Sequence, residues 1–166
     1  MKHIYVIGLM SGTSMDGINA CLVKTNGEIL NRTVHQIISN YNKETITLLK
    51  KLVFNYQKLK NDTNLLKYLS NLIASDNNIA VKKIVNLSGL KPELIGFHGQ
   101  TVFHDPSKKI SVQIGNGDLL AQLTKTNVVS QFRLNDIKNG GEGAPISPIY
   151  HKLLIESLNL DLPTCF

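Results

Sequence analysis

Residues 8–17 of the chain, GLMSGTSMDG, join an apolar run at residues 3–9 to a second apolar run at residues 18–24. Small and polar residues between two apolar runs are typical of a hairpin, so residues 11–16 predict a turn between the first two strands. A third apolar run, at residues 29–38, follows Asn26-Gly27, and this dipeptide is the strongest short hairpin signal. The chain is therefore expected to open with three antiparallel strands.

The same stretch has the composition of a phosphate-binding loop. Its small residues let backbone N–H groups approach a phosphate, and its hydroxyls add donors. The carboxylate of Asp16 lies where it could contact a magnesium ion or a water molecule of its hydration shell. The stretch lacks the lysine of GxxxxGK[ST] and does not match GxGxxG, so neither a P-loop nor a Rossmann fingerprint applies. A plain hairpin turn without a ligand is the alternative.

Helical periodicity begins after the third strand. Residues 43–56 carry apolar side chains at helical spacing with lysines between them, which predicts an amphipathic helix. A longer helix is expected to begin at Asp62 or Thr63 as its N-cap and to end at about residue 87. Asn77 and Asn78 are expected to fray or kink its middle.

Shorter segments follow, in which strands alternate with helices. We expect strands at residues 94–97, 110–114 and 127–129, helices at 118–124 and 150–158, a glycine- and proline-rich loop at 139–148, and the start of a buried strand at 160–166. This alternation after a hairpin-rich start predicts an α/β fold, a mixed sheet with helices on its faces. Residues 1–166 show no interdomain linker, so one domain is expected.

Two further stretches carry polar groups suited to a binding site. Residues 96–104, GFHGQTVFH, end a predicted strand with polar side chains, a common way to build a sugar or phosphate site. His98 and His104 are candidate metal ligands, but no third ligand follows at a suitable spacing, and a hydrogen-bonded structural histidine is favoured. In residues 131–136, QFRLND, Arg133 is a candidate clamp for a carboxylate or phosphate, and pairing between Arg133 and Asp136 is the alternative.

Composition limits the remaining possibilities. The 166 residues are 42% hydrophobic and 18% charged, as in ordinary globular proteins. The net charge of +6 comes with lysines dispersed in pairs and no arginine-rich run, which disfavours a nucleic-acid-binding module and suits an anionic small substrate. No apolar stretch approaches the roughly 20 residues of a membrane span, and the first apolar run does not resemble a signal peptide. A cytoplasmic protein without membrane contact is expected.

The polar stretches together resemble the anhydro-N-acetylmuramic acid kinase family, which belongs to the sugar-kinase, Hsp70 and actin superfamily. The GLMSGTSMDG opening is specific for that family, and GFHGQTVFH at 96–104, VQIGN at 112–116 and FRLNDIKNGGEGAP at 132–145 follow in the same order. The resemblance implies an actin-like ATPase (ribonuclease H-like) domain that uses ATP and Mg²⁺ and binds a small sugar.

The resemblance also implies roles for particular residues. The first loop would wrap the phosphates of ATP, with Asp16 near the metal. The nucleotide site would then comprise Gly12, Thr13, Ser14, Met15, Asp16, Gly17, Ile18 and Asn19. The residues facing the anhydro sugar would be His98, Gln100, Thr101, Arg133 and Asp136.

The implied reaction couples hydrolysis to phosphoryl transfer. Water opens the anhydro bridge of the sugar, and the freed hydroxyl takes the γ-phosphate of ATP, giving N-acetylmuramic acid 6-phosphate, an intermediate of cell-wall sugar recycling. In the family, a second phosphate motif and an FDxGPGN-like segment with the catalytic base follow later in the chain. These are expected beyond Phe166, so residues 1–166 are expected to be the N-terminal nucleotide- and sugar-binding lobe, with the second lobe missing.

Four positions depart from the family's usual pattern. Asn19 and Gln131 stand where aspartate is common, Phe103 where a basic residue is frequent, and Glu142 where glutamine is usual. The alternative functions are a non-catalytic nucleotide- or sugar-binding remnant and one piece of a split enzyme. The expected protein partner is a second copy, in a homodimer, or a complementing second-lobe chain.

Overall fold

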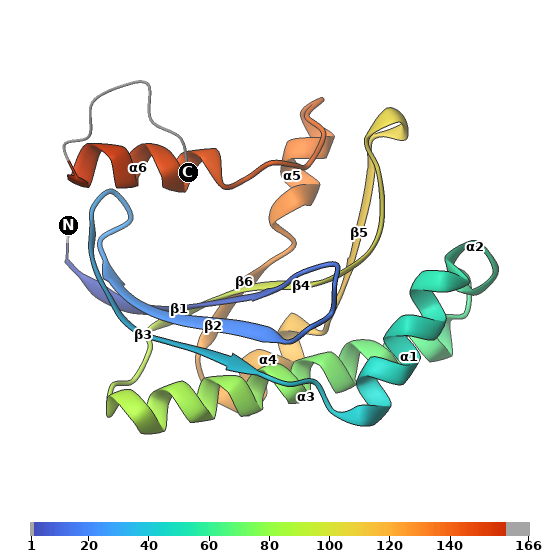
Figure 1. The fold of residues 1–166 in the computed structure, drawn as a ribbon, viewed down its shortest axis with the longest axis horizontal. Helices are drawn as coiled ribbons and strands as arrows, with labels where there is room; N and C mark the ends of the chain where they lie inside the picture. Colours follow the sequence, from blue (N-terminus) through green and yellow to red (C-terminus); the bar gives the residue numbers. More distant parts are fainter. Residues whose placement is uncertain (1, 159–166) are drawn as a thin grey trace.

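The computed structural model describes residues 2–158, apart from the side chains of residues 30–33, 149, 157 and 158. The strands form a mixed sheet, and helices lie on both of its faces (Figure 1), which confirms the predicted α/β class. The elements are β1 (Ile4–Ser11), β2 (Ile18–Thr25), β3 (Leu30–Ser39), α1 (Lys43–Phe54), α2 (Tyr56–Leu59), α3 (Thr63–Ser88), β4 (Leu94–Asp105), the 3₁₀ turn η1 (Pro106–Lys108), β5 (Ile110–Ile114), α4 (Gly117–Thr124), β6 (Asn127–Ser130), α5 (Phe132–Lys138) and α6 (Pro148–Leu158).

Two hairpins open the sheet, as the sequence predicts. β1 pairs antiparallel with β2, and the loop of residues 12–17 joins them after β1 has run through Ser11. β2 pairs antiparallel with β3 around the Asn26-Gly27 turn. There the Oδ1 atom of Asn26 accepts hydrogen bonds from the N–H groups of Glu28 and Ile29 at 3.0 and 2.8 Å. Both turns therefore form from local residues.

β4 changes its pairing partners along its length. Residues 94–97 pair parallel with β1 on one side and with β6 on the other, whereas residues 100–105 pair antiparallel with β5. The strand order is β3-β2-β1-β4-β5, with β6 beside the first part of β4. The predicted strand end at Phe97 is wrong, because pairing with β5 continues the strand through His98–Thr101 to Asp105.

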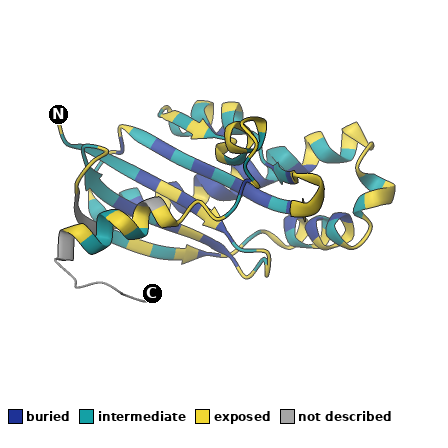
Figure 2. Cartoon of the chain, turned by 90° about the horizontal axis from the view of Figure 1, so that it is seen from above, coloured by how far each residue is buried: buried dark blue, intermediate teal, exposed yellow. Residues whose placement is uncertain are grey.

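The hydrophobic core lies between the sheet and the helices α1, α3 and α4, which cover one face of it (Figure 1). Alternate residues of the central strands point into this layer, as Figure 2 shows by the change of burial along each strand. In β1, Ile7 and Leu9 are buried, while Gly8 and Met10 are exposed on the opposite face, which carries α5 and α6. Each buried Leu or Ile side chain stabilises the fold by about 1.5–3 kcal/mol, so this alternation fixes the register of the strands.

α3 begins and ends where the sequence predicts, but its middle differs. Asp62 is its N-cap, and Gly89 in a left-handed conformation follows its last residue. The expected fraying or kink at Asn77 and Asn78 is wrong, since both are buried within one continuous helix. The Asn77 amide donates to the carbonyl of Ile73 at 2.8 Å and is thereby satisfied within the helix.

Other helices differ from the sequence expectation. The helix predicted at residues 43–56 is divided at Asn55, whose side-chain amide donates to the carbonyl of Lys51 at 3.0 Å and competes with the backbone pattern. α5, of 7 residues, is too short to give a clear helical period, so the sequence does not predict it. The strand expected at 160–166 lies outside the described residues. Within residues 2–158, no helix has both the length and the apolarity to cross a membrane.

The hairpin of β1 and β2 offers a stability test with an internal control. A Cβ atom on Gly17 would lie 3.0 Å from Cγ2 of Ile38 and 3.1 Å from the carbonyl oxygen of Ser39, whereas a Cβ atom on Gly8 would meet nothing within 4 Å. We expect Gly17→Ala to lower the free energy of unfolding by about 1–3 kcal/mol through overpacking. Gly8→Ala should raise it by about 0.5–1 kcal/mol, because glycine is unfavourable inside a strand. Urea unfolding of both variants measures the difference, and equal effects would contradict the packing of this hairpin.

Candidate functional site

The loop of residues 12–17 turns tightly as it leaves β1. The N–H group of Met15 donates to the carbonyl oxygen of Gly12 at 3.1 Å, and Met15 adopts a left-handed φ of 59°. Thr13, Ser14 and Asp16 are exposed, and their side chains make no hydrogen bond or ion pair with any residue from 2 to 158. Two hydroxyls and one carboxylate at the tip of the loop are therefore uncommitted.

The other predicted nucleotide-site residues lie in different surroundings. Gly17 is buried against β3, and Ile18 is fully buried in the core. Asn19 is exposed on the face of the sheet opposite the core, where it pairs in register with Met10. The tip of the loop and Asn19 are thus accessible to a ligand, whereas Gly17 and Ile18 are not, and Ile18 holds the start of β2 in place.

Three hydrogen-bonded side chains, those of Ser11, Tyr41 and Gln100, lie beneath this loop. The Tyr41 hydroxyl donates to Oε1 of Gln100 at 3.2 Å, and the Nε2 atom of Gln100 donates to the carbonyl oxygen of Gly12 at 3.0 Å. Ser11 Oγ lies 2.6 Å from the Tyr41 oxygen, and it must be the donor there because the single Tyr41 proton is already used. Gln100 is fully buried, so its amide serves the loop from below.

Tyr41 is held in its neutral form by its surroundings. Burial raises the pKa of Tyr41 to about 12, the hydrogen bond from Ser11 opposes that rise, and the nearby Asp76 carboxylate adds to it. The phenol therefore keeps its proton, and its donation to Gln100, throughout the physiological pH range.

On the opposite side of β4, His98 and Arg133 are in direct contact. The Nε atom of Arg133 donates to Nε2 of His98 at 3.0 Å, and Nδ1 of His98 lies 3.0 Å from the carbonyl oxygen of Gly99. Because Nε2 accepts, the proton of a neutral imidazole resides on Nδ1 and is donated to Gly99. Burial lowers the pKa of His98 from its usual 6.5, the bond to Gly99 opposes this, and the Arg133 charge adds to the lowering.

The glycine-rich loop after α5 holds Arg133 and Asp136 without joining them as an ion pair. The carbonyl oxygen of Gly143 accepts from Nη1 of Arg133 at 2.9 Å, and the N–H group of Gly143 donates to Oδ2 of Asp136 at 2.8 Å. A Cβ atom on Gly141 would overlap the Asp136 carboxylate, so the loop can close around that carboxylate only with glycine there. Asp136 therefore fixes this loop, and Gly143 links it to Arg133.

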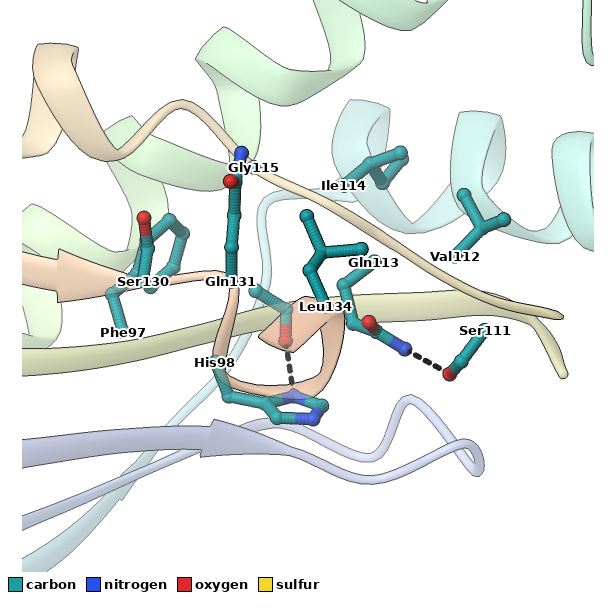
Figure 3. Close-up of a pocket in the computed structure, with 11 residues that line it drawn as sticks. Phe97, His98, Ser111, Val112, Gln113, Ile114, Gly115, Ser130, Gln131 and Leu134 are labelled. Carbon is teal, nitrogen blue, oxygen red and sulfur yellow. Dashed lines mark hydrogen bonds between the residues drawn. The ribbon is translucent and has the colours of Figure 1, made fainter. Parts of the chain in front are cut away.

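A cavity of about 190 Å³ opens beside His98 (Figure 3). Its lining joins β4, β5 and the start of α5, and includes His98, Gln113, Ser130 and Gln131. A second cavity of about 260 Å³ adjoins it and shares Gly115, Ser130 and Gln131 with it. Both openings carry hydroxyls, amides and backbone groups, and the first also has an apolar wall made by Phe97, Val112, Ile114 and Leu134. A few polar groups in such a lining can orient a small molecule.

Gln113, Ser111 and Ser130 are cavity residues that sequence reasoning did not single out. The Nε2 atom of Gln113 donates to Ser111 Oγ at 2.7 Å and to Thr101 Oγ1 at 3.2 Å, which places the hydroxyl of Thr101 next to the cavity lining. The VQIGN stretch at 112–116 contained the available signal, since it carries Gln113. Pairing of β5 with β4 brings that residue to the site.

The described residues contain no closed metal centre. Among residues 2–158, no group of three or more His, Cys, Asp and Glu side chains is placed to hold a metal ion. His98 uses both ring nitrogens in contacts with Arg133 and Gly99, and His104 is exposed elsewhere on β4. The uncommitted carboxylate of Asp16, beside the loop hydroxyls, fits a hydrated Mg²⁺ bound together with phosphates rather than a closed protein cage.

The fold and these two groups of polar residues define a class of protein. A mixed sheet flanked by helices, opened by a hairpin loop of small hydroxyl residues, is consistent with the actin-like ATPase fold of sugar kinases. The chain belongs to the anhydro-N-acetylmuramic acid kinase family, whose model matches residues 4–161.

Curated relatives agree with this assignment. The anhydro-N-acetylmuramic acid kinase of Pelagibacter ubique (strain HTCC1062) is 38% identical over 169 residues, which cover 99% of this chain and 45% of the relative. That of Brucella canis (strain ATCC 23365 / NCTC 10854 / RM-666) is 39% identical over 162 residues, covering 94% of this chain and 43% of the relative. That of Nitrobacter winogradskyi (strain ATCC 25391 / DSM 10237 / CIP 104748 / NCIMB 11846 / Nb-255) is 33% identical over 96% of this chain and 45% of the relative. The chain thus spans about half the length of the curated relatives it matches.

The state of His98 predicts a pH-dependent stability. Because its pKa is lower in the folded chain than its usual 6.5, the unfolded chain takes up this proton first as the pH falls. The contribution of neutral His98 to the free energy of unfolding is fully present above about pH 6.5. It is lost as the pH falls through the pKa of His98 in the folded chain. Urea unfolding of the wild type and of His98→Gln, which keeps an acceptor for Arg133 but does not titrate, should show the larger loss in the wild type. Parallel curves between about pH 8 and pH 5 would show that His98 is not the responsible group.

Proposed function

We propose that the chain is the nucleotide- and sugar-binding lobe of an anhydro-N-acetylmuramic acid kinase. In this reaction, water opens the anhydro bridge of the sugar, and the freed primary hydroxyl takes the γ-phosphate of ATP. The product is N-acetylmuramic acid 6-phosphate, and the reaction would serve the recycling of cell-wall sugar. The observation that carries the proposal is that one strand, β4, serves both regions. Its Gln100 bonds to the loop of residues 12–17, and its His98 lines the cavity.

The loop of residues 12–17 supplies the nucleotide half of the proposal. Thr13 and Ser14 offer hydroxyl donors to phosphate oxygens, and Asp16 offers an oxygen to a metal ion or to its water. Bound Mg²⁺ would neutralise charge on the phosphates. The absence of a lysine in this loop leaves donation to its hydroxyls and backbone N–H groups.

The cavity beside His98 supplies the sugar half. Its amides and hydroxyls, from Gln113, Gln131 and Ser130, can donate to and accept from the hydroxyls of a sugar. Gln131 lines both cavities, so its departure from the aspartate common in the family falls within the proposed binding site. We propose that Thr101 contacts the sugar from the β5 side, because Gln113 already orients its hydroxyl.

Arg133 adds the positive charge of the proposed sugar site. Its Nε and Nη1 atoms each make one described hydrogen bond, to His98 and Gly143. A guanidinium carries five N–H donors, so three remain for an anionic ligand group. Asp136 would act through Gly143, because its carboxylate accepts from that backbone N–H.

A second candidate function is binding without turnover, as a remnant or as one piece of a split enzyme. A coupled ADP-release assay on the 166-residue polypeptide, with ATP, Mg²⁺ and the anhydro sugar, separates the two. Sugar-dependent turnover in the enzyme range of roughly 1–10³ s⁻¹ would favour catalysis by this chain alone. Binding of both ligands without ADP release would favour the alternative.

Nucleotide binding tests the proposal directly. We expect Mg²⁺-dependent binding of ATP, weakened about tenfold or more in the double variant Thr13→Ala/Asp16→Ala, because a phosphate donor and a metal-directed carboxylate are both lost. The matched control is Ser107→Ala/Asp105→Ala, which also removes one hydroxyl and one carboxylate, at η1. Isothermal titration calorimetry with and without Mg²⁺ measures the affinities. Equal dissociation constants for wild type and the loop variant would contradict the assignment of this loop.

A further inference from the structure

Gln100 stands at the centre of a buried chain of hydrogen bonds that the proposed chemistry does not use. Ser11 is 3% exposed and Gln100 is 0% exposed, so neither can touch a ligand in this arrangement. The chain runs from Ser11 through the Tyr41 hydroxyl to the Gln100 amide, and from that amide to the Gly12 carbonyl. It therefore ends on the backbone at the first residue of the loop.

We propose that Tyr41 and Gln100 are positioning residues for this loop, and that they aim its backbone N–H groups and hydroxyls at the phosphates of the nucleotide. The inference rests on the proposed function of the loop. Neither residue is catalytic, because each acts through the carbonyl of Gly12.

The geometry of the peptide unit explains how a buried contact acts on an exposed loop. The carbonyl of Gly12 and the N–H group of Thr13 belong to one planar trans unit, so they point in opposite directions. Gln100 holds the carbonyl oxygen toward the protein interior. The N–H group of Thr13 is thereby directed outward, where a phosphate would approach. The same oxygen accepts from Met15, which closes the turn that carries Ser14.

Tyr41 completes the contacts that orient the Gln100 amide. An amide side chain has one acceptor end and one donor end, and the donated proton of Tyr41 selects Oε1 for its own side. The Nε2 end then faces Gly12 and also donates to the carbonyl of Thr101 at 3.2 Å. Without the hydroxyl, the amide would be held from its Nε2 end, and the buried Oε1 atom would lose the donor that Tyr41 supplies.

The position of Tyr41 is itself set from α3. Asp76 is 5% exposed, and its Oδ2 atom accepts from the N–H group of Asn42 at 3.2 Å, which ties the turn after β3 to that helix. The groups facing the Tyr41 ring and hydroxyl thus come from three elements: Ser11 on β1, Gln100 on β4 and Asp76 on α3. The loop is in this way anchored to the core helix.

The test uses the 166-residue chain labelled with ¹⁵N and the variant Tyr41→Phe, which keeps the ring and removes only the hydroxyl. We expect the amide resonances of Thr13 and Met15 to shift and the Met15 amide to exchange with solvent about three to ten times faster, the effect of losing one hydrogen bond. If the effect is local, amides in the middle of α3 should exchange with solvent at the same rate in the variant as in the wild type. Tyr56→Phe is the matched control, because Tyr56 stacks on Phe103 and makes no described contact with the loop.

Calorimetry with Mg²⁺ and ATP completes the test. We expect the dissociation constant to rise about three- to tenfold in Tyr41→Phe and to stay constant in Tyr56→Phe. Binding that is unchanged in Tyr41→Phe, or unshifted Thr13 and Met15 resonances, would overturn the positioning role while leaving the proposed function intact. No binding to the wild type would instead overturn the proposed function, and this inference with it. Gln100→Met, which removes both amide contacts, should give at least the same changes, and if it fails to fold, Tyr41→Phe decides alone.

Discussion

The bulge at Gly99 is the constraint on which both halves of the candidate site depend. Gly99 has a left-handed φ of 71°, and a Cβ atom there would lie 2.7 Å from the carbonyl oxygen of Ile114, so the position requires glycine. The pairing of β1 with β4 passes from Leu9–Phe97 to Ser11–Gln100, which adds one residue to β4. As a result Phe97 and Gln100 are both buried, although strict alternation would put them on opposite faces.

This shift distributes the polar residues of β4 between two surroundings. Gln100 points inward and bonds to the backbone of the first loop, while His98 points to the opposite side and meets Arg133. A regular strand would have placed His98 and Gln100 on the same face and left the first loop without its internal support. The bulge also marks the point at which β4 turns from its parallel partners to β5, whose Gln113 completes the cavity lining. One backbone irregularity thus organises the loop of residues 12–17 and the cavity together.

The features that the sequence predicts well are those decided by near neighbours. The Asn26-Gly27 turn, the small residues of the first loop and the Asp62 cap each act within a few positions, and the structure agrees with all three. The continuation of β4 past Phe97 depends on β5, and the contact of His98 with Arg133 spans 35 positions. Periodicity within a short window contains neither piece of information. The resemblance to the kinase family supplied the candidate residues, but burial of Gln100 and Ile18 is visible only in three dimensions.

The Arg133 contacts explain why this position suits arginine rather than lysine. A lysine ammonium is a compact charge on a flexible stem, and one such group cannot reproduce two separate N–H directions of a planar fork. Here the Nε atom is fixed by His98 and one Nη atom by Gly143, so the guanidinium plane is set before any ligand arrives. His98 can accept this bond only while it is neutral, and the nearby charge of Arg133 itself favours the neutral form. Arg133 thus favours the neutral form of His98, and His98 in turn holds Nε of Arg133, so the remaining guanidinium donors keep a fixed direction. Preorganisation of this kind lowers the entropy cost of binding.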